Sequence, residues 1–101
     1  MNEEVFTTEE IKTRLKPVFV FYNVKEARLF GSYAKKTATK KSDVDLCVNS
    51  GLKGLRFVGL IESMRKALGD KEVDVFDVSH IKKGSTIDKE IAETGEVIYE
   101  R

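Results

Sequence analysis

The chain has few of the residues from which small proteins build covalent or metal cross-links. Its 101 residues include one cysteine, Cys47, and one histidine, His80. A single cysteine excludes an internal disulfide and fits a reducing cytoplasm. The two residues together are too few for a metal site made of cysteine and histidine ligands. We expect Cys47 to be a small buried hydrophobic residue and His80 to lie in a surface loop.

Strong net charge and long apolar runs are also missing. The net charge is +1, so composition gives no argument for nucleic acid as a partner. No apolar run reaches the length of a membrane span, and the acidic N-terminal residues do not resemble a signal peptide. The 41% apolar and 35% charged shares fit a small domain with much surface rather than disorder. We therefore expect one cytoplasmic domain over residues 1–101, with no room for a second domain and no membrane contact.

Apolar spacing and capping signals predict alternating helices and strands. Thr7 and Glu10 form a capping-box pattern before a helix from about Thr8 to Tyr22, which Pro17 should kink. The other predicted helices are Ser32–Lys36, Leu52 or Lys53 to Leu68, and Asp88–Glu93, and the predicted strands are Ala27–Phe30, Asp43–Val48, Glu72–Val78 and Val97–Tyr99. This order predicts an α/β (α+β) fold, a small mixed sheet with helices on one face. The Glu- and Lys-rich residues 82–96 are expected to form a solvated amphipathic face.

A glycine–serine turn follows the first predicted strand. Gly31 lets the backbone pass close to a ligand. The amides that open the next short helix, together with the Ser32 hydroxyl, would point at a phosphate. Alone, this dipeptide would indicate an ordinary turn. Together with the carboxylates that follow it, the dipeptide favours a phosphate-binding turn.

Asp43 and Asp45 occupy alternate positions of the second predicted strand. Residues i and i+2 of a strand face the same side, so the two carboxylates would project as a pair, with Val44, Leu46 and Val48 facing a core. Aspartate is disfavoured in strands, and neighbouring carboxylates repel each other unless a cation lies between them. The pattern favours Mg²⁺ bound partly through nucleotide oxygens. The alternative is the solvent face of an ordinary edge strand.

A third carboxylate follows in the predicted strand Glu72–Val78. Asp74 lies between apolar residues, and a strand paired beside the second one could bring it next to the first two carboxylates. Asp77 has the opposite strand parity, so we expect it to cap the strand end or to belong to a turn.

Gly-Ser-Tyr-Ala at residues 31–34, a polar loop, and Ser-Asp-Val-Asp-Leu at residues 42–46 resemble the signature of the DNA polymerase β-like nucleotidyltransferases. The similarity is greatest to the minimal nucleotidyltransferase (MNT) domain. The leading helix, the strand with the third carboxylate and the closing residues 98–101 extend the resemblance over nearly the whole chain.

The resemblance implies a nucleotidyltransferase fold and a Mg²⁺-dependent enzyme that transfers a nucleoside monophosphate, AMP from ATP, to a hydroxyl group, with two Mg²⁺ ions. It assigns phosphate binding to Gly31, Ser32 and Lys35, and it assigns catalysis and metal binding to Asp43, Asp45 and Asp74. Asp74 would also be the general base for the attacking hydroxyl.

One departure from the family pattern concerns the residues after Gly-Ser-x-Ala. The family has Arg-Gly there, and this chain has Lys35-Lys36. Lysine keeps the charge but loses the bidentate fork of arginine, and the loss of glycine stiffens the turn. The change therefore bears on nucleotide affinity and turnover rather than on metal binding. Lys35, Lys36, Lys40 and Lys41 could steer a triphosphate or an acidic partner, or be solvated loop charges.

The acceptor of the nucleotidyl group is not defined by these residues. A chain this short is not expected to enclose both a nucleotide and a small substrate, so we expect the acceptor on a partner. Resemblance to MNT domains implies a HEPN-domain protein in a hetero-oligomer, with the MNT member as an antitoxin that adenylylates a tyrosine of a HEPN ribonuclease. The alternatives are transfer to a small molecule such as an aminoglycoside, RNA tailing, which the near-neutral charge disfavours, and a catalytically idle module that masks its partner.

Overall fold

Four strands form one mixed sheet in the order β3-β2-β1-β4 in the computed structural model, which describes residues 4–101. They are β1 (Glu26–Phe30), β2 (Val44–Asn49), β3 (Val73–Asp77) and β4 (Glu96–Glu100). β1 is antiparallel to β2 and to β4, whereas β2 and β3 are parallel. A parallel pair needs a crossover connection, and here a helix supplies it.

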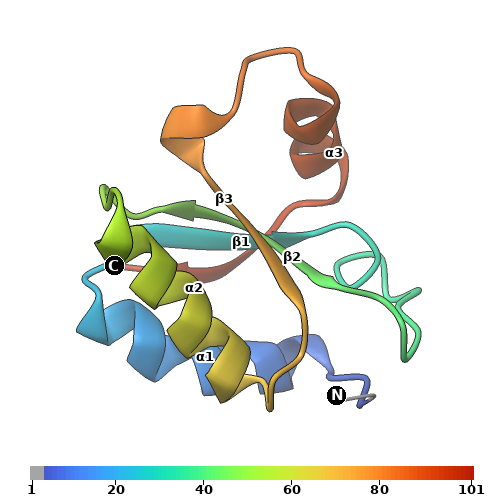
Figure 1. The fold of residues 1–101 in the computed structure, drawn as a ribbon. Helices are drawn as coiled ribbons and strands as arrows, with labels where there is room; N and C mark the ends of the chain where they lie inside the picture. The colour runs from blue at the N-terminus through green and yellow to red at the C-terminus, as the bar shows by residue number, and fades with distance from the viewer. Residues whose placement is uncertain (1–3) are drawn as a thin grey trace.

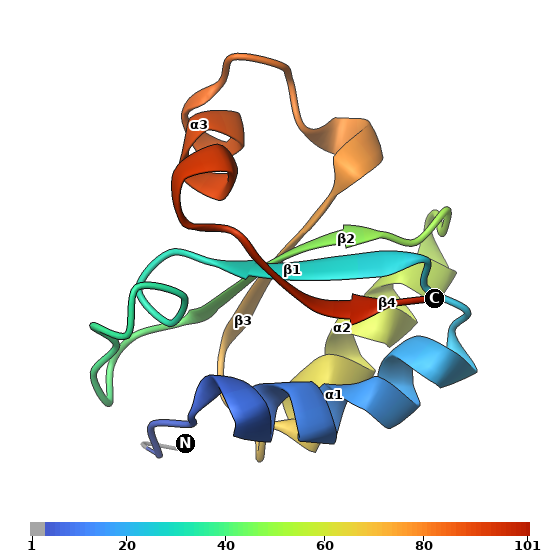
Figure 2. The same ribbon diagram turned by 180° about the vertical axis from the view of Figure 1, so that it is seen from behind.

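The helices lie on both sides of this sheet. α1 (Thr8–Phe21) and α2 (Leu55–Ala67) pack side by side against one face, as predicted (Figures 1 and 2). A short 3₁₀ helix, η1 (Val78–His80), leads to α3 (Thr86–Thr94), which lies on the opposite side and contacts β1. The α/β fold class with a small mixed sheet is confirmed, and α3 departs from the one-face arrangement. Within residues 4–101, no helix is long and apolar enough to span a membrane.

The predicted capping box starts α1. The Glu10 N–H donates to Thr7 Oγ1 at 3.1 Å, and the Thr7 N–H donates to Glu10 Oε1 at 2.8 Å, so two backbone donors at the helix start are satisfied. Ile11, Leu15 and Phe19 then form a fully buried stripe. The helix continues through Pro17 and ends at Phe21.

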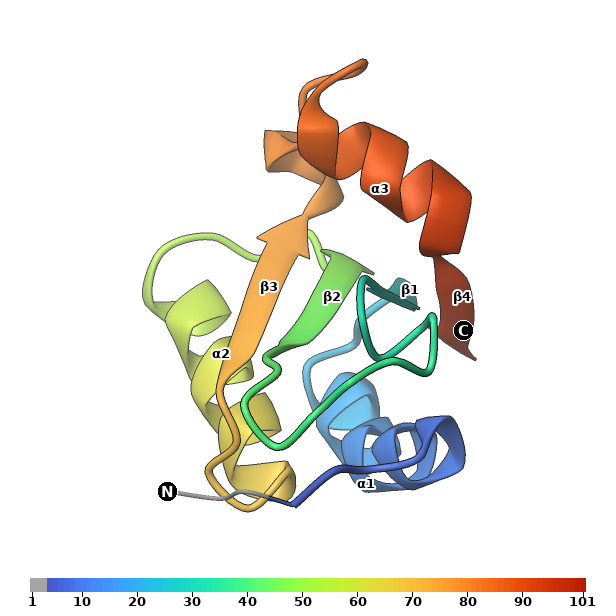
Figure 3. The same ribbon diagram turned by 90° about the vertical axis from the view of Figure 1, so that its right-hand side faces the viewer.

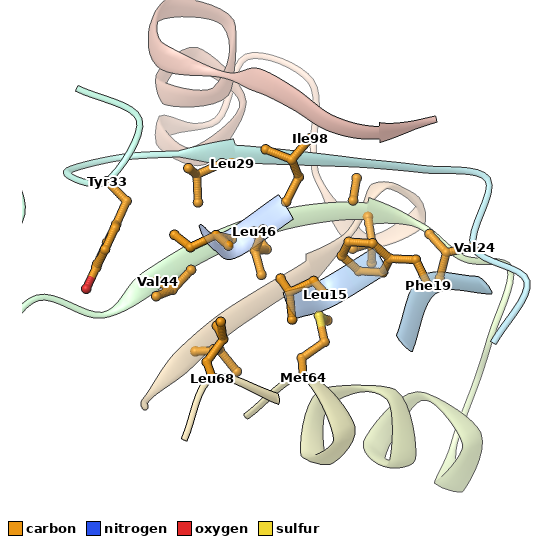
Figure 4. Close-up of a cluster of buried hydrophobic side chains, with 14 of the residues drawn as sticks. Leu15, Phe19, Val24, Leu29, Tyr33, Val44, Leu46, Met64, Leu68 and Ile98 are labelled. Carbon is orange, nitrogen blue, oxygen red and sulfur yellow. The ribbon is translucent and has the colours of Figure 1, made fainter. Parts of the chain in front are cut away.

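The core lies between the sheet and the layer formed by α1 and α2. Figure 4 shows Leu15 and Phe19 from α1 and Met64 from α2 beneath Leu46 of β2, with Ile98 of β4 in the same cluster. Each such side chain contributes about 1.5–3 kcal/mol through burial. Val44, Leu46 and Val48 are completely buried, as their alternation predicts, so the intervening residues of β2 face the side where α3 lies.

Residues 32–36 do not form the predicted helix. They form a hydrogen-bonded turn in which the Lys35 N–H donates to the Gly31 carbonyl at 3.0 Å and the Thr37 N–H to the Ser32 carbonyl at 2.9 Å. Lys36 has φ of +62°, in the left-handed region. Because an L-residue in that conformation ends a right-handed helix, only one turn of backbone can form.

Other boundaries differ by a few residues. α2 begins at Leu55 rather than Leu52 or Lys53, after Gly54 at φ +58°. α3 is longer than predicted because the Ser85 side chain accepts from the Asp88 N–H and caps its start. Cys47 is buried, as expected, and His80 is exposed as expected but ends a short 3₁₀ helix rather than lying in a loop.

Candidate active site

The parallel pairing of β2 and β3 brings two of the predicted carboxylates together. Asp45 and Asp74 are direct register partners, so their side chains leave the same side of the sheet. Asp43 lies just before β2 and is exposed, Asp74 is exposed, and Asp45 is half-buried. The predicted strand pairing thus places Asp74 beside Asp45, whereas its closeness to Asp43 stays a prediction.

Asp45 is the most perturbed acid of this group. Partial burial, followed by the negative charges of Asp74, Glu90 and Asp43, raises its pKa to about 6, and a hydrogen bond with Asp74 adds to the shift. Each cause disfavours the ionised form of Asp45. A cation between the carboxylates would reverse this balance, because it favours the charged form.

Glu90 is a fourth carboxylate, which the sequence analysis did not single out. It comes from α3, and a Cβ atom added to Gly31 would lie 3.3 Å from Glu90 Oε1 and would clash with Asp45 Oδ2. Gly31, Asp45 and Glu90 are therefore neighbours. Glu90 lies in the stretch that we expected to be a solvated face, and no local signal marks it as different from Glu93.

Gly31 is required at its position for two reasons. Its φ is +74°, which L-residues with a side chain rarely adopt, and Asp45 leaves no room for a Cβ atom. Its N–H donates to Thr94 Oγ1 at 3.0 Å, and the Thr94 hydroxyl donates to the Glu90 carbonyl at 2.8 Å. The start of the turn is thus tied to the last residue of α3 (Figure 3).

The turn leaves several donors free for an anion. Within residues 4–101, the backbone N–H groups of Ser32, Tyr33 and Ala34 and the Ser32 hydroxyl have no hydrogen-bond acceptor. Successive unpaired N–H groups of this kind form the anion-binding concavities of many phosphate sites. The Tyr33 ring packs into the core (Figure 4) and anchors the middle of the turn.

The two lysines of this turn differ in their surroundings. Lys35 is exposed, and its ammonium group has no ion-pair partner among the described residues. Lys36 Nζ lies 3.5 Å from Thr8 Oγ1 at the start of α1. Lys35 is therefore the freer of the two, and its predicted contact with nucleotide phosphate stays a prediction.

The donor set fits Mg²⁺, although residues 4–101 contain no group of three His, Cys, Asp or Glu side chains arranged closely enough to hold an ion by themselves. Carboxylate oxygens are hard ligands, and Mg²⁺ commonly uses only one or two of them together with water and substrate phosphates. Asp45 and Asp74 meet this requirement. The crowding that raises the pKa of Asp45 is the electrostatic condition that a divalent cation relieves.

Asp77 has the structural role predicted for it. It is 3% exposed and accepts hydrogen bonds from the N–H and hydroxyl groups of Ser50 (3.1 and 2.6 Å) and of Ser79 (3.0 and 2.6 Å). Burial raises the pKa of Asp77, but these hydrogen bonds outweigh it and hold the pKa below its ordinary value. Asp77 thus joins the end of β2 to η1.

A groove of about 320 Å³ lies on the same face of the sheet as the carboxylates. It lies between the sheet and the segment from η1 to α3, and Arg28, Cys47, Ile81 and Ile91 contribute to its walls. Cys47 is two residues beyond Asp45 on β2 and faces the same side of the sheet. The groove offers room for a part of a ligand that is not phosphate.

The sequence matches known nucleotidyltransferases. The family model described as "Polymerase beta, Nucleotidyltransferase" matches residues 9–101. A protein of Methanocaldococcus jannaschii, provisionally named a protein adenylyltransferase, is 38% identical over 74 residues, which cover 71% of this chain and 78% of the relative.

The fold also has solved counterparts. A chain in a crystal structure of a toxin–antitoxin with AMP-PNP has a TM-score of 0.75 and 20% identity, over 89% of this chain and 73% of that chain. A chain in a structure of tri-AMPylated Shewanella oneidensis HEPN toxin in complex with MNT antitoxin has a TM-score of 0.70 and 17% identity, over 94% of this chain and 74% of that chain. At these identities the likeness shows the fold. The family model and the 38% identical relative go further, and the chain belongs to the polymerase β nucleotidyltransferase family.

Proposed function

We propose that this nucleotidyltransferase transfers AMP from ATP to a hydroxyl group of a partner protein, with Mg²⁺ as its cofactor. The observation that carries the proposal is the pairing of Asp45 with Asp74 beside a glycine turn whose next three N–H groups are free. Carboxylates for a cation and amides for phosphate are then available on one side of the sheet.

The turn would bind the phosphates of the nucleotide. The N–H groups of Ser32, Tyr33 and Ala34 and the Ser32 hydroxyl would donate to the β- and γ-phosphate oxygens. Lys35 would add a positive charge at the edge of this cradle. Gly31 provides the bend and leaves space for Asp45.

The carboxylates would serve the transfer itself. Asp45 and Asp74 would hold Mg²⁺ together with nucleotide oxygens, and Asp43 would have to approach them to become a third ligand, since the three carboxylates are not grouped closely enough by themselves. The ion would neutralise charge on the triphosphate. Asp74, the exposed partner of Asp45, would take the proton of the acceptor hydroxyl. The hydroxyl oxygen then bonds to the α-phosphorus of ATP as the bond to pyrophosphate breaks. Asp45 would have to lose its proton before it binds a cation.

Two observations support a protein acceptor. The relative from Methanocaldococcus jannaschii is provisionally named a protein adenylyltransferase, and one structure of the same fold contains an AMPylated HEPN toxin with an MNT antitoxin. The exposure of Asp74 leaves the site open to an acceptor from another molecule. We therefore propose a HEPN-domain protein as the partner, a tyrosine as the acceptor, and the cytoplasm, where ATP is made available, as the location.

A second candidate is a catalytically idle module that masks its partner. Lys35-Lys36 stands where the family pattern has Arg-Gly, and lysine lacks the bidentate fork of arginine, which gives the second candidate some support. It predicts partner binding without nucleotide chemistry.

Labelling with ATP carrying ³²P at the α-phosphate separates the candidates. Cell lysate, Mg²⁺ and the wild-type protein should give a labelled protein band that Asp43→Ala/Asp45→Ala does not give. The matched control Glu93→Ala removes an exposed carboxylate of α3 and should label like the wild type. Label confined to RNA or small molecules would replace the proposed acceptor. A partner that co-purifies without any label would favour the masking module.

A further inference from the structure

One face of α3 contacts the turn that begins at Gly31. Glu90 and Thr94 are separated by four residues and therefore lie one above the other on the helix. The Glu90 side chain is a neighbour of Gly31 and Asp45, and the Thr94 hydroxyl bonds to the Gly31 N–H. Figure 3 shows the C-terminal end of α3 beside the connection between β1 and β2.

The hydrogen bonds of Thr94 have a defined direction. Its hydroxyl hydrogen is donated to the Glu90 carbonyl at 2.8 Å. The lone pairs of Oγ1 are then the acceptor for the Gly31 N–H at 3.0 Å. Both polar functions of the hydroxyl are used, and Gly31 is buried. Removing the hydroxyl would leave a buried N–H without its partner.

The hydrogen bond from Gly31 to Thr94 restrains the start of the turn, where other contacts are few. The Gly31 carbonyl accepts a hydrogen bond from the Lys35 N–H, and the Tyr33 ring is held in the core. Among residues 4–101, Thr94 is the single acceptor for the Gly31 N–H. Glycine has more backbone freedom than any other residue, so without Thr94 the start of the turn would have to be ordered when a ligand binds.

We propose that Thr94 is a positioning residue for nucleotide phosphate: it holds Gly31 so that the N–H groups of residues 32–34 stay at a constant place relative to Asp45. The inference rests on the proposed binding of a nucleoside triphosphate at this turn. The Thr94 hydroxyl hydrogen is already donated to the Glu90 carbonyl, so it is not available to a phosphate oxygen, and we assign Thr94 a positioning role rather than a direct contact.

Three variants test this role by titration with Mg²⁺ and AMP-PNP. Thr94→Val keeps the branched shape and removes the hydroxyl, and it should weaken binding roughly tenfold, the effect of one lost hydrogen bond of about 1.4 kcal/mol. Thr94→Ser restores the hydroxyl and should bind within about threefold of the wild type. The matched control Thr86→Val, at the exposed first position of the same helix, should bind like the wild type. In transfer assays Thr94→Val should raise KM for ATP more than it lowers kcat.

Amide hydrogen exchange gives a readout that requires neither nucleotide nor activity. The Gly31 amide of the free wild-type protein should be protected, and its exchange should be at least about tenfold faster in Thr94→Val. An unprotected Gly31 amide in the wild type would overturn the inference even if Thr94→Val failed to fold.

The outcomes also separate this inference from the proposed function. Wild-type protein that binds Mg²⁺ and AMP-PNP, with Thr94→Val folded and equal in affinity, would overturn the role of Thr94 alone. Wild-type protein that binds no nucleotide would overturn the proposed function and the role of Thr94 with it.

Discussion

The two ends of the β2–β3 pair each hold a shielded aspartate, and the two differ in their hydrogen bonds. Asp77 is almost fully buried, yet four donors from Ser50 and Ser79 keep its pKa below the ordinary value. Asp45 is only half-buried, yet burial, followed by the negative charges of Asp74, Glu90 and Asp43, raises its pKa to about 6, and no hydrogen bond lowers it again. Burial alone therefore does not decide the pKa, and the supply of donors does. We infer that Asp77, which has four hydrogen-bond donors, stabilises the fold, and that Asp45, which has carboxylate neighbours, is placed to bind a cation.

The largest effect should come from Asp45→Asn. It removes a charge that the proposed mechanism needs, so nucleotidyl transfer should fall by at least about 100-fold. The free energy of unfolding at pH 7 should stay equal or rise, because repulsion with Asp74 and Glu90 is removed. Rates of AMP transfer and urea denaturation measure the two quantities. Transfer at the wild-type rate would contradict the assignment of the site.

Asp77→Ala should show the opposite behaviour. Four donors lose their acceptor, so the free energy of unfolding should fall by about 1–3 kcal/mol. The affinity for Mg²⁺ and nucleotide, measured by titration at a temperature where the variant is folded, should change little. A loss of binding without a loss of stability would show that Asp77 belongs to the active site.

The pH dependence of stability should have opposite signs at the two residues. The folded-state pKa of Asp45 is raised to about 6, so between about pH 4 and pH 6 the folded state holds more protons than the unfolded state. The contribution of Asp45 to the free energy of unfolding therefore falls as pH rises through that window. For Asp77 the pKa is lowered, so its contribution is lost as pH falls below the unfolded value. Denaturation curves from pH 4 to pH 7 should lose the first trend in Asp45→Asn and keep it in Asp77→Ala.

The same Asp45 proton should affect ligand binding. Because a cation competes with this proton, affinity for Mg²⁺ with AMP-PNP should decrease as pH falls from 7 to 5. Asp77→Ala should retain this decrease, since its carboxylate takes no part in it. An affinity independent of pH over this range would contradict the placement of the cation beside Asp45.

The smallest expected effect is on the free energy of unfolding, and it comes from the backbone conformation of Lys36 in the turn near Asp45. Lys36 is at φ +62°, which is disfavoured by about 1–2 kcal/mol for an L-residue, whereas glycine adopts it readily but loses more entropy on folding. Lys36→Gly should therefore raise the free energy of unfolding by about 0.5–1 kcal/mol. Lys35→Gly, at a residue without positive φ, should lower it. Thermal unfolding of the two variants makes the comparison, and a destabilised Lys36→Gly would show that its side chain matters more than its backbone.

Local patterns were sufficient for much of the fold. The capping box of Thr7 and Glu10 was confirmed because it involves groups only three residues apart. The alternation of β2 was confirmed because neighbouring side chains of a strand must face opposite sides. The helix predicted at residues 32–36 was wrong, since propensity does not report that Lys36 takes a left-handed conformation.

The sequence by itself was enough to predict that Asp45 follows a glycine turn on a strand whose alternate residues are buried, because strand parity and turn chemistry act over a few residues; Asp43 lies just before that strand, and its pairing with Asp45 stays a prediction. Asp74 needed one further condition, the parallel register of β3 with β2. Only the tertiary structure decided that Glu90 and Thr94 belong beside Gly31. Thr94 is 63 residues away from Gly31 in the chain, and a Glu- and Lys-rich helix has the same local pattern whether it faces water or a site. The face of α3 that lies against the site depends on the path of the chain from β3 through η1 to α3. Packing across the sheet sets that path.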